Sequence, residues 1–163
     1  MAETVIIKTI DQSDIGDIEL VAKKMKLTLM EVIDPEVGGQ MYTDDWLIDR
    51  VVQHLDNRLR GKVLIAVQGD NNIGHTILRL ESKDNKQFGL FSTIYVDPEY
   101  RRNDVASLLI EKAEAWFLEN NLNRFVTYTS KMNQKLIHLF EKHGYKVTDK
   151  FPEKNMIEIS KSF

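Results

Sequence analysis

A short charged loop between two strongly patterned segments is the feature that most constrains this chain. Residues 90–96 are rich in β-forming side chains and predict a strand, and the apolar spacing from Val105 to about Asn120 predicts an amphipathic helix. The connecting residues 97–104 are polar and contain a proline. A loop at the start of a helix can direct several backbone N–H groups, together with the positive end of the helix dipole, at one point. The segment therefore predicts an anion site suited to phosphate, with a plain helix cap at Asn103 or Asp104 as the alternative.

The remaining patterns predict the order β-α-α-β-β-β-α-β-α-β-β. The expected strands are residues 4–10, 63–67, 73–81, 88–96, 124–129, 146–150 and 155–160, and the expected helices are about 13–25, 43–59, 105–120 and 133–142. Three consecutive strands with tight turns predict an antiparallel meander. The strand 124–129 follows a helix, so it should lie parallel to the strand 88–96 through a right-handed crossover. Trp46 and Trp116 fit apolar stripes and are expected in the core.

Composition excludes several classes of function. The 163 residues carry a net charge of −3, which argues against a nucleic-acid partner, and they include no cysteine, which removes disulfides and thiol catalysis. The four histidines show no metal-binding spacing, so no metal is expected. No run approaches the ~20 apolar residues that span a bilayer, and residues 1–10 lack the features of a signal peptide. We therefore expect a cytoplasmic protein with no membrane partner.

Two blocks of the sequence match known family motifs. Residues 94–101, Ile-Tyr-Val-Asp-Pro-Glu-Tyr-Arg, are similar to the strand-to-loop signature of the GNAT superfamily of N-acetyltransferases. Arg101 and Ala106 match the loop motif Arg/Gln-x-x-Gly-x-Gly/Ala, whereas Asp104 replaces its first glycine. Residues 133–145 are similar to the family block Asn-x-x-Ala-x-x-Leu-Tyr-Glu-Lys-x-Gly-Phe. The resemblance implies a mixed α/β fold over one N-acetyltransferase domain, residues 1–163. Its central sheet would be mostly antiparallel, with a parallel, splayed central strand pair and about four flanking helices.

The resemblance also implies acetyl-coenzyme A as the cosubstrate. Its diphosphate would bind the loop and its pantetheine arm would lie between the splayed strands. The residues implied in cofactor binding are Ile94, Tyr95, Val96, Arg101, Arg102, Asn103, Asp104, Val105, Ala106, Ser107, Asn133 and Phe140. The Val96 N–H would face the thioester oxygen, and an amine would attack the thioester directly in a ternary complex.

The candidate catalytic residues are Val96, whose role the resemblance implies, together with Tyr128 and Glu81. Many relatives place a proton-donating tyrosine at the position of Phe140, and phenylalanine cannot donate. Tyr128, Tyr145 or water could replace that donor, or the thiolate could leave unprotonated. Glu81 or a chain of waters could remove the amine proton. The alternative function is a catalytically weak module that binds acyl-coenzyme A as a sensor or interaction domain.

The acceptor is expected to be a small-molecule or peptide amine. The segment from Glu31 to Asp45 holds five acidic residues and no lysine or arginine, and the resemblance places it near the acceptor entrance. This charge would attract a cationic amine, although a solvated acidic loop is the alternative. The resemblance also admits a homodimer.

Overall fold

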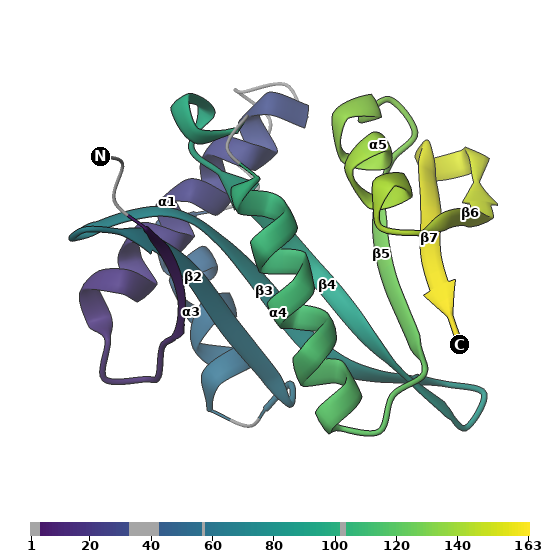
Figure 1. The fold of residues 1–163 in the computed structure, drawn as a ribbon, viewed down its shortest axis with the longest axis horizontal. Helices are drawn as coiled ribbons and strands as arrows, with labels where there is room; N and C mark the ends of the chain where they lie inside the picture. The colour runs from purple at the N-terminus through teal and green to yellow at the C-terminus, as the bar shows by residue number, and fades with distance from the viewer. Residues whose placement is uncertain (1–3, 33–42, 57, 102–103) are drawn as a thin grey trace.

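A computed structural model describes residues 4–32, 43–56, 58–101 and 104–163, with only the backbone described for residues 28–32. The elements follow the expected order (Figure 1). The strands are β1 (Val5–Thr9), β2 (Gly61–Gln68), β3 (Asn71–Lys83), β4 (Lys86–Val96), β5 (Arg124–Ser130), β6 (Lys146–Phe151) and β7 (Met156–Ser162). The α-helices among the described residues are α1 (Ile15–Val32), α3 (Asp44–Leu55), α4 (Val105–Glu119) and α5 (Gln134–Lys142). Short 3₁₀ turns, η1 (Pro98–Tyr100) and η2 (Pro152–Lys154), follow β4 and β6.

The seven strands form one sheet in the order β1-β2-β3-β4-β5-β7-β6. Every neighbouring pair is antiparallel except β4 and β5, which are parallel. The helix α4 connects these two strands, as the crossover prediction required. The expected meander and parallel pair are therefore confirmed.

Helices lie on both faces of the sheet. One face carries α4 and α5 over a core that includes Leu109, Phe117 and Phe140. The other face carries α1 and α3. The core beneath them includes residues of β2 and extends across the sheet as far as Ile77 of β3. In Figure 1, α1 and α3 lie behind β2, β3 and β4, whereas α5 is the helix beside β5, β6 and β7 among the described residues. Within the described part of the chain, α1 and α3 therefore cover β2 to β4 and leave β5 to β7 uncovered on their face.

Local signals explain where the helices begin and how closely they pack. The Thr43 hydroxyl accepts a hydrogen bond of 3.1 Å from the Trp46 N–H and caps α3. Trp46 itself is 49% exposed, so the expectation that it lies in the core is wrong: the buried stripe of α3 passes through the next residue, Leu47. On β4, a Cβ at Gly89 would collide with the Phe117 ring, so glycine lets α4 approach the sheet. None of the described helices is long and apolar enough to cross a membrane.

Candidate functional site

The parallel strands β4 and β5 separate along part of their length. Their pairing covers only Gly89 with Phe125, Leu90 with Val126, and Phe91 with Thr127. Beyond this point β4 continues for five residues to Val96 and β5 for three to Ser130, and the ribbons diverge (Figure 1). We call this opening the wedge and its closed end, at Phe91 and Thr127, the apex. The expected splayed strand pair is therefore present.

Two details of β4 shape the wedge. A bulge between Ile77 and Leu78 of β3 leaves Ser92 unpaired on β4 at the apex. At the other end, the Asp97 N–H donates a 2.8 Å hydrogen bond to the Ile73 carbonyl, so this peptide faces β3. Because backbone groups alternate in direction along a strand, the N–H groups of Ile94 and Val96 face away from β3, toward the wedge. They can bond an extended ligand as an added strand would.

The start of α4 supplies the expected anion site. The first intrahelical bond runs from the Leu108 N–H to the Asp104 carbonyl at 3.1 Å. The N–H groups of Val105, Ala106 and Ser107 therefore have no acceptor within the helix, and they form the positive end of its dipole. Arg102 and Asn103, two expected cofactor residues, lie outside the described part of the chain.

Asp104 adopts the left-handed conformation, with φ 58° and ψ 19°. Glycine enters this region at little cost, and aspartate is one of the few other residues that tolerate it. Its side chain makes no cap hydrogen bond to α4, so the alternative that Asp104 is a side-chain helix cap is wrong. The backbone shape that the motif's glycine would allow is thus retained, with a carboxylate added beside the anion site.

The loop is fastened at both ends. The nearly buried Lys24 of α1 forms a 2.9 Å ion pair with Asp97 and donates a 2.8 Å hydrogen bond to the Asn72 carbonyl. Arg101 donates from Nε to the Val96 carbonyl at 2.8 Å and its guanidinium lies over the Tyr95 ring. Arg101 therefore braces the end of β4, and its fixed position keeps the loop at the mouth of the wedge.

The opposite wall of the wedge is formed by β5 and α5. Asn133 caps α5 by accepting from the Leu136 N–H at 3.3 Å, and its amide donates to the Thr129 hydroxyl at 3.2 Å. A 3.0 Å contact between His143 Nε2 and the Ser107 hydroxyl links the end of α5 to the first turn of α4. This contact joins the two walls beside the anion site.

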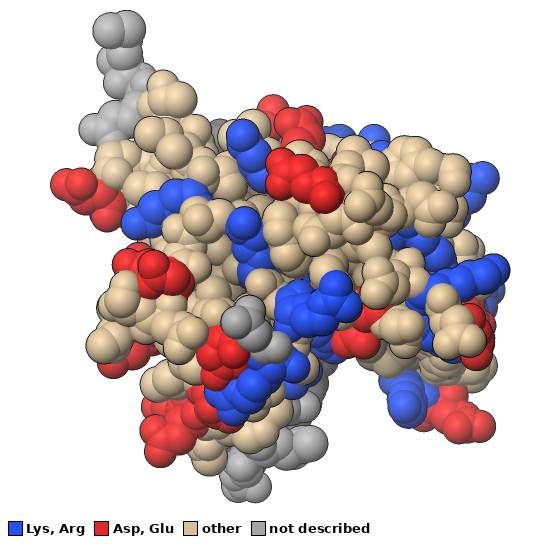
Figure 2. Space-filling model, turned by 90° about the horizontal axis from the view of Figure 1, so that it is seen from below, with Lys and Arg blue, Asp and Glu red and all other residues tan. Residues whose placement is uncertain are grey.

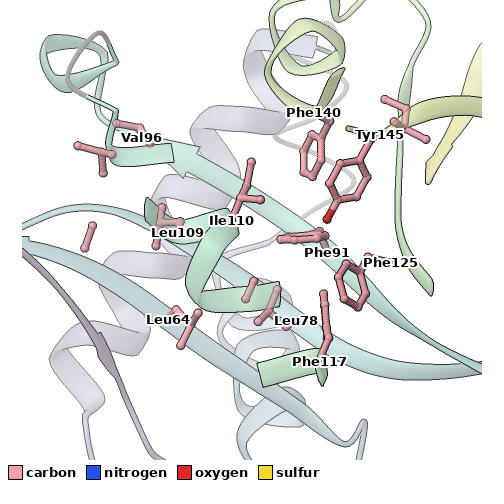
Figure 3. Close-up of a cluster of buried hydrophobic side chains, with 14 of the residues drawn as sticks. Leu64, Leu78, Phe91, Val96, Leu109, Ile110, Phe117, Phe125, Phe140 and Tyr145 are labelled. Atoms are coloured by element: carbon pink, nitrogen blue, oxygen red, sulfur yellow. The ribbon is translucent and has the colours of Figure 1, made fainter. Parts of the chain in front are cut away.

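Aromatic side chains fill the α4 and α5 face of the apex (Figure 3). The ring of Phe140 is fully buried and lies 5.2 Å from Phe91 and 4.9 Å from Tyr145, measured between ring centroids. The Tyr145 hydroxyl donates to Glu114 at 2.7 Å, and burial together with this carboxylate raises its pKa. Tyr145 is thus held in the core, and of the two tyrosines considered as proton donors only Tyr128 has an exposed side chain.

The structure does not bring the three expected catalytic residues together. Val96 pairs with Gly74 of β3, seven residues from Glu81, so Glu81 lies about 23 Å away along the strand. Glu81 forms an ion pair with Arg79. Tyr128 lies one residue beyond the apex, about 13 Å from Val96 along the strand direction. Tyr128 and Val96 therefore occupy opposite ends of the wedge.

Only part of the acidic segment expected near the acceptor, residues 31–45, lies within the described residues. Residues 33–42 and the Glu31 side chain lie outside the described residues. Asp44 forms a 3.1 Å ion pair with Lys26 of α1, which offsets its charge. The Lys26 cation therefore offsets part of the negative charge in the described part of the segment.

Polar groups that the sequence patterns did not single out also border the wedge. The Thr127 hydroxyl donates to the Phe91 carbonyl at 3.1 Å at the apex. Glu158 of β7 is buried beside Tyr128. Only strand pairing brings these residues to the site, so no local motif could reveal them.

His75 of β3 lies on the other side of β4 from the wedge. It is fully buried against Tyr95, and burial lowers its pKa to about 3, with a smaller effect from Lys24.

Two surface hollows lie at the opposite end of the sheet, around the turn between β3 and β4. They share Lys86, Gln87, Asn123 and Arg124. Figure 2 views the molecule from this end, where basic and acidic side chains are interspersed. Within the described ranges, no three histidine, aspartate or glutamate side chains are grouped so as to hold a metal ion.

Comparisons with known proteins agree with this architecture. The family model described as "Acetyltransferase (GNAT) family" matches residues 30–145. The PaiA N-acetyltransferase of Thermoplasma acidophilum, solved with coenzyme A, is 21% identical with a TM-score of 0.76, covering 98% of this chain and 99% of that one. A GNAT-family acetyltransferase of Streptococcus pneumoniae is 17% identical with a TM-score of 0.73, covering 98% and 100%. Arabidopsis thaliana Naa50, solved with a bisubstrate analogue, is 18% identical with a TM-score of 0.67, covering 98% and 99%. No curated protein matches this sequence.

Proposed function

Because the chain belongs to the GNAT family of acetyltransferases, we propose that it transfers the acetyl group of acetyl-coenzyme A to a primary amine. The observation that carries the proposal is the wedge between β4 and β5, together with the amides at the start of α4 that precede the hydrogen bonds of the helix. Structures of similar fold were solved with coenzyme A or a bisubstrate analogue containing it, which supports this cosubstrate. The whole chain would act as one catalytic domain.

The amides of Val105, Ala106 and Ser107 would hold the diphosphate, and Ile94 and Val96 would bond the pantetheine arm. From Val96 to Phe91 the strand spans five residues, about 16 Å, which suits an extended arm. The thioester would then lie near the apex, and the Val96 N–H would donate a hydrogen bond to the pantetheine arm.

In the reaction, the lone pair of a neutral amine forms a bond to the thioester carbon, and the carbonyl electrons move to oxygen. When the intermediate collapses, the carbon–sulfur bond breaks and coenzyme A leaves as a thiolate. The nitrogen loses one proton and the thiolate gains one, so the products are an amide and coenzyme A. Phe140 contributes no proton and would pack against the thiol end of the cofactor.

Calorimetry with coenzyme A and acetyl-coenzyme A tests the cofactor site. Ala106→Glu places a carboxylate among the amides and should weaken binding at least tenfold. Lys112→Gln is a matched control, because it changes the net charge by the same amount on an exposed part of α4. Equal loss in both variants, or no heat from the parent at millimolar cofactor, would contradict the proposal.

Release of coenzyme A in the presence of primary amines tests the transfer. We expect turnover with at least one of benzylamine, spermidine and a dipeptide amide with a free N-terminus. Tight cofactor binding without turnover would favour the alternative of a catalytically weak binding module, which the replacement of the usual tyrosine by Phe140 would explain.

A further inference from the structure

Two tyrosine–glutamate pairs in this protein share the same chemistry but differ in their surroundings. Tyr128 donates to Glu158 Oε2 at 3.2 Å, and Arg124 donates to Glu158 Oε1 at 2.6 Å. Tyr145 donates to Glu114 at 2.7 Å, and Lys161 donates to the same carboxylate at 3.2 Å. Tyr145 is 2% exposed inside the core, whereas Tyr128 is 36% exposed. The Tyr128 side chain is therefore accessible to a ligand, whereas Tyr145 is not.

The pair of Tyr128 and Glu158 lies at the apex of the wedge. Tyr128 follows Thr127, the last residue of β5 that pairs with β4. Tyr128 and Glu158 are register partners on β5 and β7, so their side chains share one face of the sheet. The pair therefore borders the point at which the cofactor thioester would lie.

Among the described residues, the Tyr128 side of the apex is the more exposed one, since Tyr128 is 36% exposed whereas Phe140 and Tyr145 are buried. The opposite face is filled by the buried rings of Phe91, Phe140 and Tyr145 (Figure 3). On the Tyr128 face, the core beneath α1 and α3 ends at Ile77 of β3. An amine that meets the thioester would thus pass the Tyr128 hydroxyl.

The hydrogen bonds prepare the Tyr128 oxygen to accept a proton. Glu158 is 5% exposed and is held by Arg124 and by the Thr148 hydroxyl at 2.6 Å, so its orientation is fixed. The phenol proton points to Glu158, which leaves the oxygen lone pairs directed elsewhere. Burial and the nearby Glu158 raise the Tyr128 pKa, so the phenol stays neutral near pH 7.

We propose that Tyr128 and Glu158 form a relay that takes the proton from the acceptor amine. As the nitrogen bonds to the thioester carbon, its proton moves to the Tyr128 oxygen and the phenol proton moves to Glu158 Oε2. The carbon–sulfur bond then breaks, the thiolate takes a proton from water, and Glu158 returns its proton to water through Tyr128. Tyr128 is the catalytic residue and Glu158 is a positioning residue that acts through it. The acceptor class is a primary amine in its neutral form, and the inference rests on the proposed function.

Acetylation kinetics of Tyr128→Phe, Glu158→Gln and the double variant test the relay, with the three amines named above. Each single change should lower kcat about 100-fold, while the Kd of coenzyme A stays within about twofold. The double variant should be no slower than either single variant, because both changes interrupt one path. The rate of Tyr128→Phe should rise more steeply at alkaline pH than that of the parent, because hydroxide can replace the relay.

Tyr145→Phe and Glu114→Gln are matched controls, since they remove the same chemistry from the buried pair. They should lower the Tm and change kcat less than threefold. Tyr128→Phe keeps the ring at an exposed position, so it remains decisive if Glu158→Gln does not fold.

A kcat of Tyr128→Phe equal to that of Tyr145→Phe would overturn the relay, and so would strictly additive losses in the double variant. A parent that binds coenzyme A but acetylates none of the amines would overturn the relay and leave the cofactor site standing. A parent that neither binds coenzyme A nor acetylates an amine would overturn the proposed function itself.

Discussion

The Thr127 hydroxyl donates a 3.1 Å hydrogen bond to the Phe91 carbonyl at the last position where β4 and β5 pair. Thr127→Val should lower the free energy of unfolding by about 1–3 kcal/mol, because it leaves a buried carbonyl without this partner. It should also weaken coenzyme A binding, since it loosens the apex. Denaturant unfolding and calorimetry measure the two effects.

Thr76→Val is the control for this change. The Thr76 hydroxyl donates to the Thr93 carbonyl at 2.7 Å from the β3 side of β4, so a similar loss of stability is expected there. Coenzyme A affinity should be retained in this variant. Equal losses of affinity in the two variants would show that the Thr127 bond has no special role at the apex.

Asp104→Gly should both stabilise the protein and tighten coenzyme A binding. Glycine adopts the left-handed backbone of position 104 at a lower conformational cost than aspartate does. The free energy of unfolding should therefore rise by up to about 1 kcal/mol. Removing the carboxylate should improve affinity about 5- to 10-fold at low salt, as expected for about 1 kcal/mol of repulsion. Thermal melts and calorimetry at two salt concentrations provide the measurements.

Asp104→Asn separates the two effects, because asparagine loses the charge and still tolerates the left-handed region. It should tighten binding as much as glycine does, with little change in Tm. Weaker binding in either variant would mean that the carboxylate supports the loop rather than opposing the phosphates.

Lys24→Met should be strongly destabilising, because it leaves Asp97 and the Asn72 carbonyl without their buried cation. A loss of about 3 kcal/mol in the free energy of unfolding is expected. The double variant Lys24→Met with Asp97→Asn should lose less than the sum of the single changes, since neither charge is then left alone. Additive losses in denaturant unfolding would show that the ion pair does not couple these residues.

Stability should depend on pH through two buried histidines. Burial lowers the pKa of His75 to about 3 and that of His54 to about 4, whereas an unfolded histidine titrates near pH 6.5. Between these values the unfolded chain holds more protons, so the free energy of unfolding falls as the pH is lowered below about 6.5. Each histidine contributes a slope of up to about 1.4 kcal/mol per pH unit.

His75→Gln and His54→Gln test this dependence. Each variant should show a shallower decline than the parent below pH 6.5, and the double variant should combine the two reductions. Above that pH the three curves should run parallel to that of the parent. A His75→Gln slope identical to that of the parent would mean that His75 is protonated in the folded protein.

Much of the fold could be predicted because it depends on local patterns. Periodicity and turn residues gave the element order, and the helix between residues 96 and 124 required a parallel pair of strands. Thr43 and Asn133 lie at the helix starts expected from the sequence, and each caps its helix. The prediction that Trp46 is buried was wrong because Trp46 precedes the buried residue Leu47, and the sequence alone does not show which of two adjacent apolar residues faces the core.

The candidate site likewise combines features that are local in the sequence with features set by strand pairing. The sequence by itself determined the charged loop, the helix that follows it and the strand that enters it, because these features are contiguous in the chain. Only the tertiary structure decided that Val96 and Glu81 lie far apart, because the hairpin register sets their separation. It also placed Glu158 beside Tyr128, 30 residues away, because the pairing of β5 with β7 is a non-local contact that no spacing in the sequence encodes.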